Sequence, residues 1–98
     1  MNKEAIIDYI YICLKNLASE LESEELENPN LQTRIYGAGG IIDSIALVSF
    51  IVDLESMLSE KLNTEIVLAN SRAMSQHNSP FKDVSSLSDY IFSLIHDS

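Results

Sequence analysis

Cysteine and histidine, common ligands of metal sites, are scarce in this chain of 98 residues, which has one Cys and two His. The single Cys13 excludes a disulfide within the chain, and its apolar neighbours Ile12 and Leu14 predict a core position. His77 and His96 lie at no metal-ligand spacing from Cys13 or from a pair of acids. We therefore expect both histidines on the surface and no metal site.

Basic residues are also few, with six Lys and Arg against fifteen Asp and Glu, for a formal net charge of −9. A field of this sign repels phosphate backbones and anionic membrane surfaces, which argues against nucleic acid as a partner. It favours protein partners that present Lys and Arg.

Long apolar runs are missing too, since none approaches the roughly 20 residues that a membrane span needs. The N-terminal stretch MNKEAIIDYI interrupts its apolar residues with Lys3, Glu4 and Asp8, unlike a secretory signal peptide. We therefore expect a cytoplasmic protein without a membrane span, and the start at Met1 suggests a free-standing one. The length is that of one small domain, residues 1–98.

Three segments carry apolar residues at helical spacing, and they predict helices over about 3–21, from Asp43 or Ser44 to about 62, and from about 84 to near the C-terminus. The acids crowded into 20–27 have the wrong sign for a helix C-terminus, so the first helix should fray or stop there. Asp43 and Ser44 are both good N-cap residues for the second. Ser86 and Asp89 stand in capping-box spacing near the start of the last.

The segments between these helices show no strand alternation of useful length. Residues 28–43, which contain all three glycines, predict a long loop, and its GAGG stretch lacks the spacing of either phosphate-binding fingerprint. Residues 66–74 could form a short helix or turn. The sequence therefore predicts an all-α fold, a four-helix bundle of three main helices and one short one, with a long loop between the first two main helices.

The beginning of the second main helix is apolar on nearly every side, because Ile45, Val48, Phe50 and Val52 lie outside its main stripe. Such a helix is buried all round or has two apolar faces, and in a domain this small we expect two faces, one of them for a partner.

The sequence contains few residue patterns that are typical of an enzyme active site. The acids of 20–27 lack the alternating ligands and central Gly of an EF-hand loop, so a solvated acidic face is the better interpretation. A Ser-His-Asp triad stays open, because such triads assemble in space, but a small helical bundle offers little wall for a water-excluding active site. We expect no catalytic residues and no enzyme.

Ser44 remains, and a serine at this position could be a simple N-cap. Its surroundings resemble the acyl carrier protein family, and the resemblance covers most of the chain. The matching residues are Asp43-Ser44-Ile45, Val48, Leu54-Glu55, Thr64-Glu65-Ile66, Val84, Leu87, Tyr90 and Ile91. The resemblance implies a small acidic four-helix bundle of acyl-carrier type and a monomer.

In that family the motif serine is esterified with 4'-phosphopantetheine, whose terminal thiol carries acyl groups as thioesters. The resemblance implies this covalent cofactor on Ser44, with Asp43 helping to hold magnesium and the modifying enzyme at the site. It also implies as partners a phosphopantetheinyl transferase and the acyl-loading and acyl-transfer enzymes of a fatty-acid, lipid or polyketide-like pathway.

Two further sets of residues follow from the resemblance. The candidates for partner recognition on the second main helix are Ile45, Val52, Asp53 and Glu55. The candidates for a gap that shelters the acyl chain are Val48, Ile51, Ile66, Leu87 and Tyr90. The latter could equally fill an ordinary core in the unloaded protein.

The sequence departs from the best-known fatty-acid carriers at Ala46 and Ser49, where acids are frequent. This difference predicts a carrier for a specialised pathway, with a less acidic and more apolar docking surface. Two alternatives stay open, namely a carrier-like helical binding module without a prosthetic group and an aminoacyl or peptidyl carrier.

Overall fold

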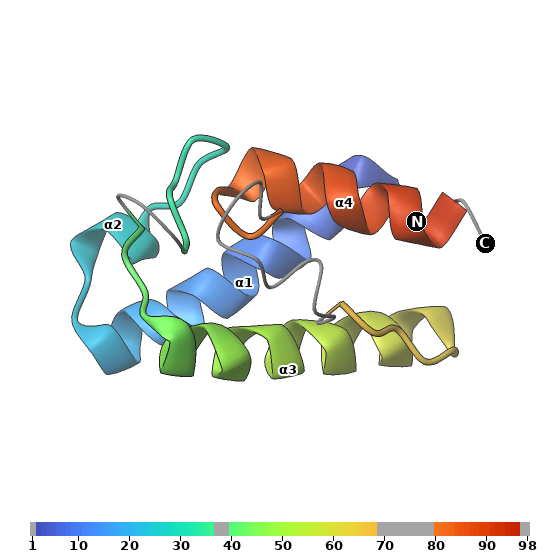
Figure 1. Ribbon diagram of the computed structural model, residues 1–98, viewed down its shortest axis with the longest axis horizontal. Coiled ribbons are helices and arrows are strands. Elements are labelled where there is room, and N and C mark those ends of the chain that lie inside the picture. The colour runs from blue at the N-terminus through green and yellow to red at the C-terminus, as the bar shows by residue number, and fades with distance from the viewer. Residues whose placement is uncertain (1, 37–39, 69–79, 97–98) are drawn as a thin grey trace.

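A computed structural model describes residues 2–36, 40–68 and 80–96 of the chain (Figure 1). These residues form four helices, α1 (Lys3–Leu21), α2 (Glu24–Glu27), α3 (Ser44–Leu62) and α4 (Val84–His96), and no strand. The helix α1 packs against each of the other three, whereas no Cα atom of α3 lies within 8 Å of one of α4. The all-helical prediction is confirmed, with α1 as the central element of the fold.

The bounds of the three long helices agree with the predictions, and side-chain caps explain them. At α1 the N-cap Asn2 accepts a hydrogen bond from the N–H of Ala5, and at α3 Asp43 accepts one from Ala46 (both 2.8 Å). Asp43, rather than Ser44, is thus the N-cap of α3. Both helices end in a left-handed residue, Glu22 (φ 52°) and Asn63 (φ 54°).

The start of α4 differs from the expected capping box. Asp83 is the capping residue, because its Oδ1 accepts the N–H of Ser86 at 2.7 Å. Ser86 therefore lies inside the helix. Asp89 forms an ion pair with Lys3 instead of closing a box.

The short helix lies elsewhere than predicted. Residues 66–68 are not helical and 69–74 are outside the described residues, while the four-residue α2 follows α1 directly. The acids that have the wrong sign for the C-terminus of α1 have the right sign for the first turn of a new helix. The buried Leu26 anchors that turn to the core.

One hydrophobic core holds the helices together. Its members are Ile6, Ile10, Cys13, Leu14, Leu17, Ala18, Leu26, Ile35, Ile42, Leu47, Phe50, Ile51, Leu54, Leu58, Leu68, Phe81, Val84, Leu87 and Ile91. The set draws on all four helices, on the loop before α3, and on Leu68 and Phe81 in the described segments after α3 and before α4. None of the described helices is both long enough and apolar enough to cross a bilayer.

The loop that leads into α3 is fastened to the segment before α4. The N–H of Ile35 donates to the carbonyl oxygen of Lys82 (2.9 Å), and that of Tyr36 donates to Phe81 (3.1 Å). The N–H of Ile42 then donates back to Ile35 at 3.0 Å. These backbone bonds, together with the buried side chains of Ile35 and Ile42, set where α3 begins.

Candidate functional site

Ser44 is the first residue of α3 and its side chain is exposed. It follows Asp43, whose carboxylate caps the helix, and Ile42, which is buried. The serine is therefore presented to solvent directly after a backbone segment that is held in place. Its hydroxyl makes no hydrogen bond with a described residue.

Gly40 explains how the chain enters this site. A Cβ at position 40 would lie 2.8 Å from the Cα and carbonyl carbon of Tyr36, closer than real Cβ contacts come. Only glycine permits this approach without moving the backbone. The close contact and the Ile42–Ile35 hydrogen bond fix the loop segment directly before Ser44.

The N-terminus of α3 is chemically suited to a phosphate ester. The N–H of Ala46 is satisfied by Asp43, and those of Ser44 and Ile45 find no acceptor among the described residues. Such N–H groups and the positive end of the helix dipole favour an anion. The carboxylate of Asp43 opposes an anion there, and its observed contact is structural.

The exposed side of α3 is apolar, as predicted. Ile45 is 79% exposed, and Val48 and Val52 are each 53% exposed. Their spacing of three and four residues places them along one side of the helix, and we call these three residues the α3 stripe. The prediction of two apolar faces is confirmed, because the opposite side of α3 is buried in the core.

The two acids expected beside this stripe have different positions. Asp53 is exposed, as a recognition residue should be. Glu55 is half-buried, and its Oε2 accepts the N–H of Leu68. Tyr90 of α4 donates its hydroxyl proton to the carbonyl oxygen of the same Leu68 at 3.0 Å. Glu55 thus helps to hold the segment after α3 between α3 and α4.

Four of the five expected pocket residues lie in the hydrophobic core or pack against it, and the fifth, Val48, does not. Val48 lies on the exposed stripe, because α3 turns its other side to the core. Ile51 and Leu87 are core residues. Tyr90 packs edge-on against Phe81. Of the five, Ile66 alone lines the cavity described next.

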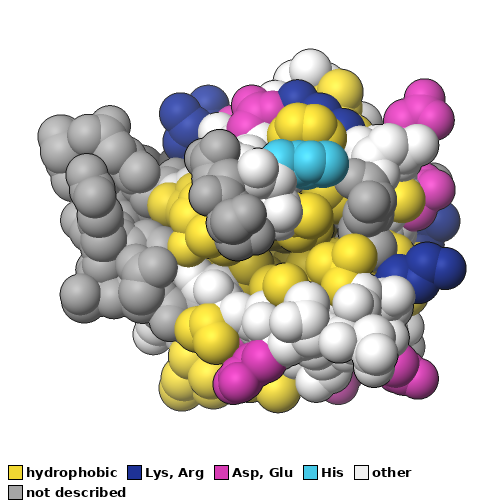
Figure 2. Space-filling view, turned by 90° about the vertical axis from the view of Figure 1, so that its right-hand side faces the viewer, with side chains coloured by type: hydrophobic (Ala, Val, Ile, Leu, Met, Phe, Trp, Pro, Cys, Tyr) yellow, Lys and Arg dark blue, Asp and Glu magenta, His cyan; other side chains and the backbone are white. Residues whose placement is uncertain are grey.

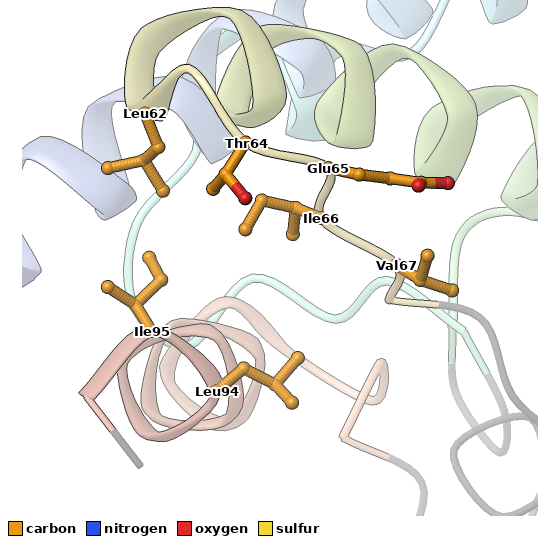
Figure 3. A pocket seen from close by; sticks show the side chains of 7 residues that line it. All are labelled: Leu62, Thr64, Glu65, Ile66, Val67, Leu94 and Ile95. Atoms are coloured by element: carbon orange, nitrogen blue, oxygen red, sulfur yellow. The ribbon is translucent and has the colours of Figure 1, made fainter. Parts of the chain in front are cut away.

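This cavity, of about 360 Å³, separates the end of α3 and the segment after it from the last turns of α4 (Figure 3). Figure 2 shows hydrophobic side chains gathered on this end of the molecule. The lining consists of Leu62, Thr64, Glu65, Ile66, Val67, Leu94 and Ile95. Leu62 is eighteen residues beyond Ser44, so this part of the lining lies about 27 Å from the serine along α3, whereas Val67 directly precedes Leu68, which Glu55 of α3 contacts.

Sequence reasoning missed most of this lining. Leu94 and Ile95 read as ordinary positions of an amphipathic helix, and Leu62 reads as the end of the α3 core stripe. The cavity exists because α3 and α4 do not meet directly. The spacing of apolar residues along one helix gives no information on the distance between two helices.

Cys13 is confirmed as a core residue, 1% exposed. Burial raises the pKa of its thiol to about 12, and the charge of Asp53 adds to the effect. Its Sγ donates to the Sδ of Met57 at 3.5 Å. The sole thiol of the chain is therefore neither accessible nor ionised near neutral pH, and it is not a nucleophile.

Among the described residues, no group of three His, Cys, Asp or Glu side chains could hold a metal ion. His96 is exposed at the end of α4, with its ring 4.2 Å from that of Phe92. His77 and the glycines at 37 and 39 lie outside the described residues.

Comparison with known proteins adds no assignment to this site, because no family model, curated protein or solved structure matches the chain.

Proposed function

We propose that the protein is an acyl carrier whose Ser44 bears a 4'-phosphopantetheine arm. The observation that carries the proposal is the combination at the start of α3. An exposed serine, whose hydroxyl makes no hydrogen bond with a described residue, stands at a capped helix terminus with unpaired N–H groups, directly before an exposed apolar stripe. A serine placed in this way suits attachment better than catalysis.

Three residues would have separate roles in attachment of the arm. Ser44 forms the ester bond, and the N–H groups of Ser44 and Ile45 lie where they stabilise its phosphate. Asp43 keeps the first turn of α3 formed and offers its carboxylate to the magnesium of the modifying enzyme. When bound, the arm supplies a thiol that carries acyl groups as thioesters, which the buried Cys13 is unable to do.

The proposal includes the acyl-carrier type of the bundle and a monomer in the cytoplasm. The three long helices and the long loop before Ser44 support the bundle type, whereas the short helix α2 follows α1 directly instead of lying between α3 and α4. The apolar α3 stripe supports enzymes of a specialised pathway as partners, because its exposed residues are Ile and Val rather than acids. The proposal also includes an acyl group as the cargo of the arm and the cavity lined by Ile66 as the place that shelters its acyl chain.

The test is enzymatic modification. The purified protein is incubated with coenzyme A, magnesium and a broad-specificity phosphopantetheinyl transferase, and intact mass is measured. We expect one phosphopantetheine adduct on the wild type and on Ser56→Ala, a matched change of an exposed serine on the same helix, and none on Ser44→Ala. An unmodified wild type, or an adduct that persists in Ser44→Ala, refutes the proposal.

A binding module without a prosthetic group is the second candidate, and the α3 stripe favours it equally because docking needs no arm. It predicts that Ser44→Ala keeps full activity in cells, whereas Val52→Glu abolishes it.

Intact mass of protein purified from its own source separates an acyl from an aminoacyl or peptidyl load. Labelling of Ser44 by a fluorophosphonate probe would instead indicate a hydrolase.

A further inference from the structure

The cavity between the end of α3 and the last turns of α4 has a defined direction. Its upper wall in Figure 3 is formed by residues 64–68, which we call the wall segment. Ile66 is held beside Ser59, because its N–H donates to the Oγ of that serine at 2.9 Å. The next anchor is Leu68, whose N–H donates to Glu55, about one turn nearer the start of α3. The wall segment therefore runs antiparallel to α3, and the cavity beneath it follows the same direction.

The two ends of the cavity differ in their distance from Ser44. Leu62 and Ile95 face each other at the far end (Figure 3). Leu62 lies about 27 Å from the serine along α3. Val67 marks the near end, close to the level of Glu55, which is eleven residues or about 16 Å from the serine. The cavity therefore covers about 11 Å of the length of α3.

The proposed arm on Ser44 is just long enough to reach the near end. About fourteen bonds separate the serine oxygen from the sulfur of phosphopantetheine, and each bond of about 1.5 Å advances an extended chain by about 1.3 Å. The extended arm therefore spans about 18 Å. Its sulfur reaches the near end of the cavity but not Leu62, so the part of the cavity beyond is left for the acyl chain.

The remaining length fits an acyl chain of about eight carbons. The far end lies about 9 Å beyond the reach of the arm, and about seven or eight carbons of an extended chain cover this distance. The volume of about 360 Å³ agrees with a short ligand, because it is near the lower end of the range for ligand sites, about 300–1,000 Å³. Chains of two to four carbons would leave most of the cavity empty.

The lining also indicates the polarity of the cargo. Its aliphatic residues are Leu62, Ile66, Val67, Leu94 and Ile95. The carboxylate of Glu65 is the one charged group among the described lining residues. A carboxylate at the end of the cargo would be repelled by Glu65 and would lose its hydration. The cavity therefore favours a neutral aliphatic chain over one that ends in an acid.

We propose that the cargo of this protein is a neutral, medium-chain acyl group of about eight carbons, whose length is set by Leu62 and Ile95. The thioester stays at the near end beside Val67, and the methyl end of the chain lies between Leu62 and Ile95. Removal of each CH₂ group from water drives the chain into the cavity. The inference rests on the proposed function for the arm on Ser44, and it adds the class of the cargo.

The test attaches acyl groups of defined length to the full chain. A broad-specificity transferase and acyl-coenzyme A of two to sixteen carbons give the loaded proteins, and Tm is measured for each. We expect Tm to rise by at least about 4 °C from the four-carbon to the eight-carbon load and then to level off. An eight-carbon load that ends in a carboxylate should give less than half of this rise.

Variants test which residues set the length at which Tm levels off. Leu62→Ala extends the cavity, so this length should increase by about two carbons. Leu94→Trp should decrease it, because Leu94 faces Ile66 across the middle of the cavity and is 37% exposed, which leaves room for a larger side chain (Figure 3). The matched control is Leu21→Ala, since Leu21 also ends a long helix but lies outside the cavity lining. Each variant is compared with its own two-carbon load, so a general loss of stability cancels.

The inference is overturned if Tm is independent of chain length, if it still rises from ten to sixteen carbons, or if the carboxylate-ended load stabilises as much as the neutral one. It is also overturned if Leu62→Ala and Leu21→Ala level off at the same length. In each of these cases the adduct has formed, so the proposed function stands. Absence of any adduct on Ser44 refutes the proposed function and this inference together.

Discussion

The first turn of α3 depends on the side chain of Asp43, and replacing it with alanine should destabilise the protein. The lost interaction is the hydrogen bond from the N–H of Ala46 to Oδ1 at 2.8 Å. Removal of an N-cap side chain costs about 1 kcal/mol of unfolding free energy, within a range of about 0.5–2. Asp43 is exposed, so cavity formation adds nothing. For a domain of this size, about 1 kcal/mol corresponds to a decrease in Tm of about 4–8 °C.

Asp43→Asn separates the cap from the charge. Asparagine caps helices about as well as aspartate, so we expect its free energy of unfolding to stay within about 0.5 kcal/mol of the wild type. If the carboxylate also helps to hold magnesium during modification, this variant should acquire its phosphopantetheine much more slowly while remaining stable. Asp43→Ala should be impaired in both respects.

Urea denaturation followed by circular dichroism gives the stabilities, and the initial rate of adduct formation gives the second measurement. The cap assignment is refuted if Asp43→Ala is as stable as the wild type, or if Asp43→Asn loses as much stability as Asp43→Ala. The magnesium role is refuted if Asp43→Asn is modified at the wild-type rate.

Four further predictions concern Cys13, Gly40 and Phe50. Cys13 should resist a thiol reagent in the folded, unmodified protein at pH 8, and modification should add one fast-reacting thiol; rapid labelling before modification would contradict its burial. Because the folded pKa of Cys13 is raised from 9.0 to about 12, the contribution of the protonated thiol is fully present below pH 9 and decreases as pH rises toward 12. Cys13→Ala should lack this part of the alkaline loss in urea titrations. Gly40→Ala should cost about 1–3 kcal/mol through its contact with the backbone of Tyr36, and an unchanged urea midpoint would refute that contact. Phe50→Ala should cost about 3–5 kcal/mol because Phe50 is fully buried, whereas the exposed Phe92→Ala should cost much less, and equal losses would contradict the burial pattern.

The three long helices could be predicted because their signals are local. Apolar spacing and capping residues act within a few turns, so the bounds near Leu21 and Leu62 agree with the structure. The buried position of Cys13 and the exposed stripe at the start of α3 followed from the same patterns. Near Ser44 both sides of α3 are apolar, so the period did not distinguish the exposed Val48 from the buried Phe50.

The sequence by itself determined the helical class, the acidic field and the exposed serine at a helix start, because each depends on composition or on neighbours along the chain. Only the tertiary structure decided that Glu55 turns inward to Leu68, that Gly40 lies against Tyr36, and that the ends of α3 and α4 leave a cavity between them. These features join residues that are distant in sequence or depend on one close approach of the backbone. They follow from how the helices and loops pack around α1, which no single segment encodes.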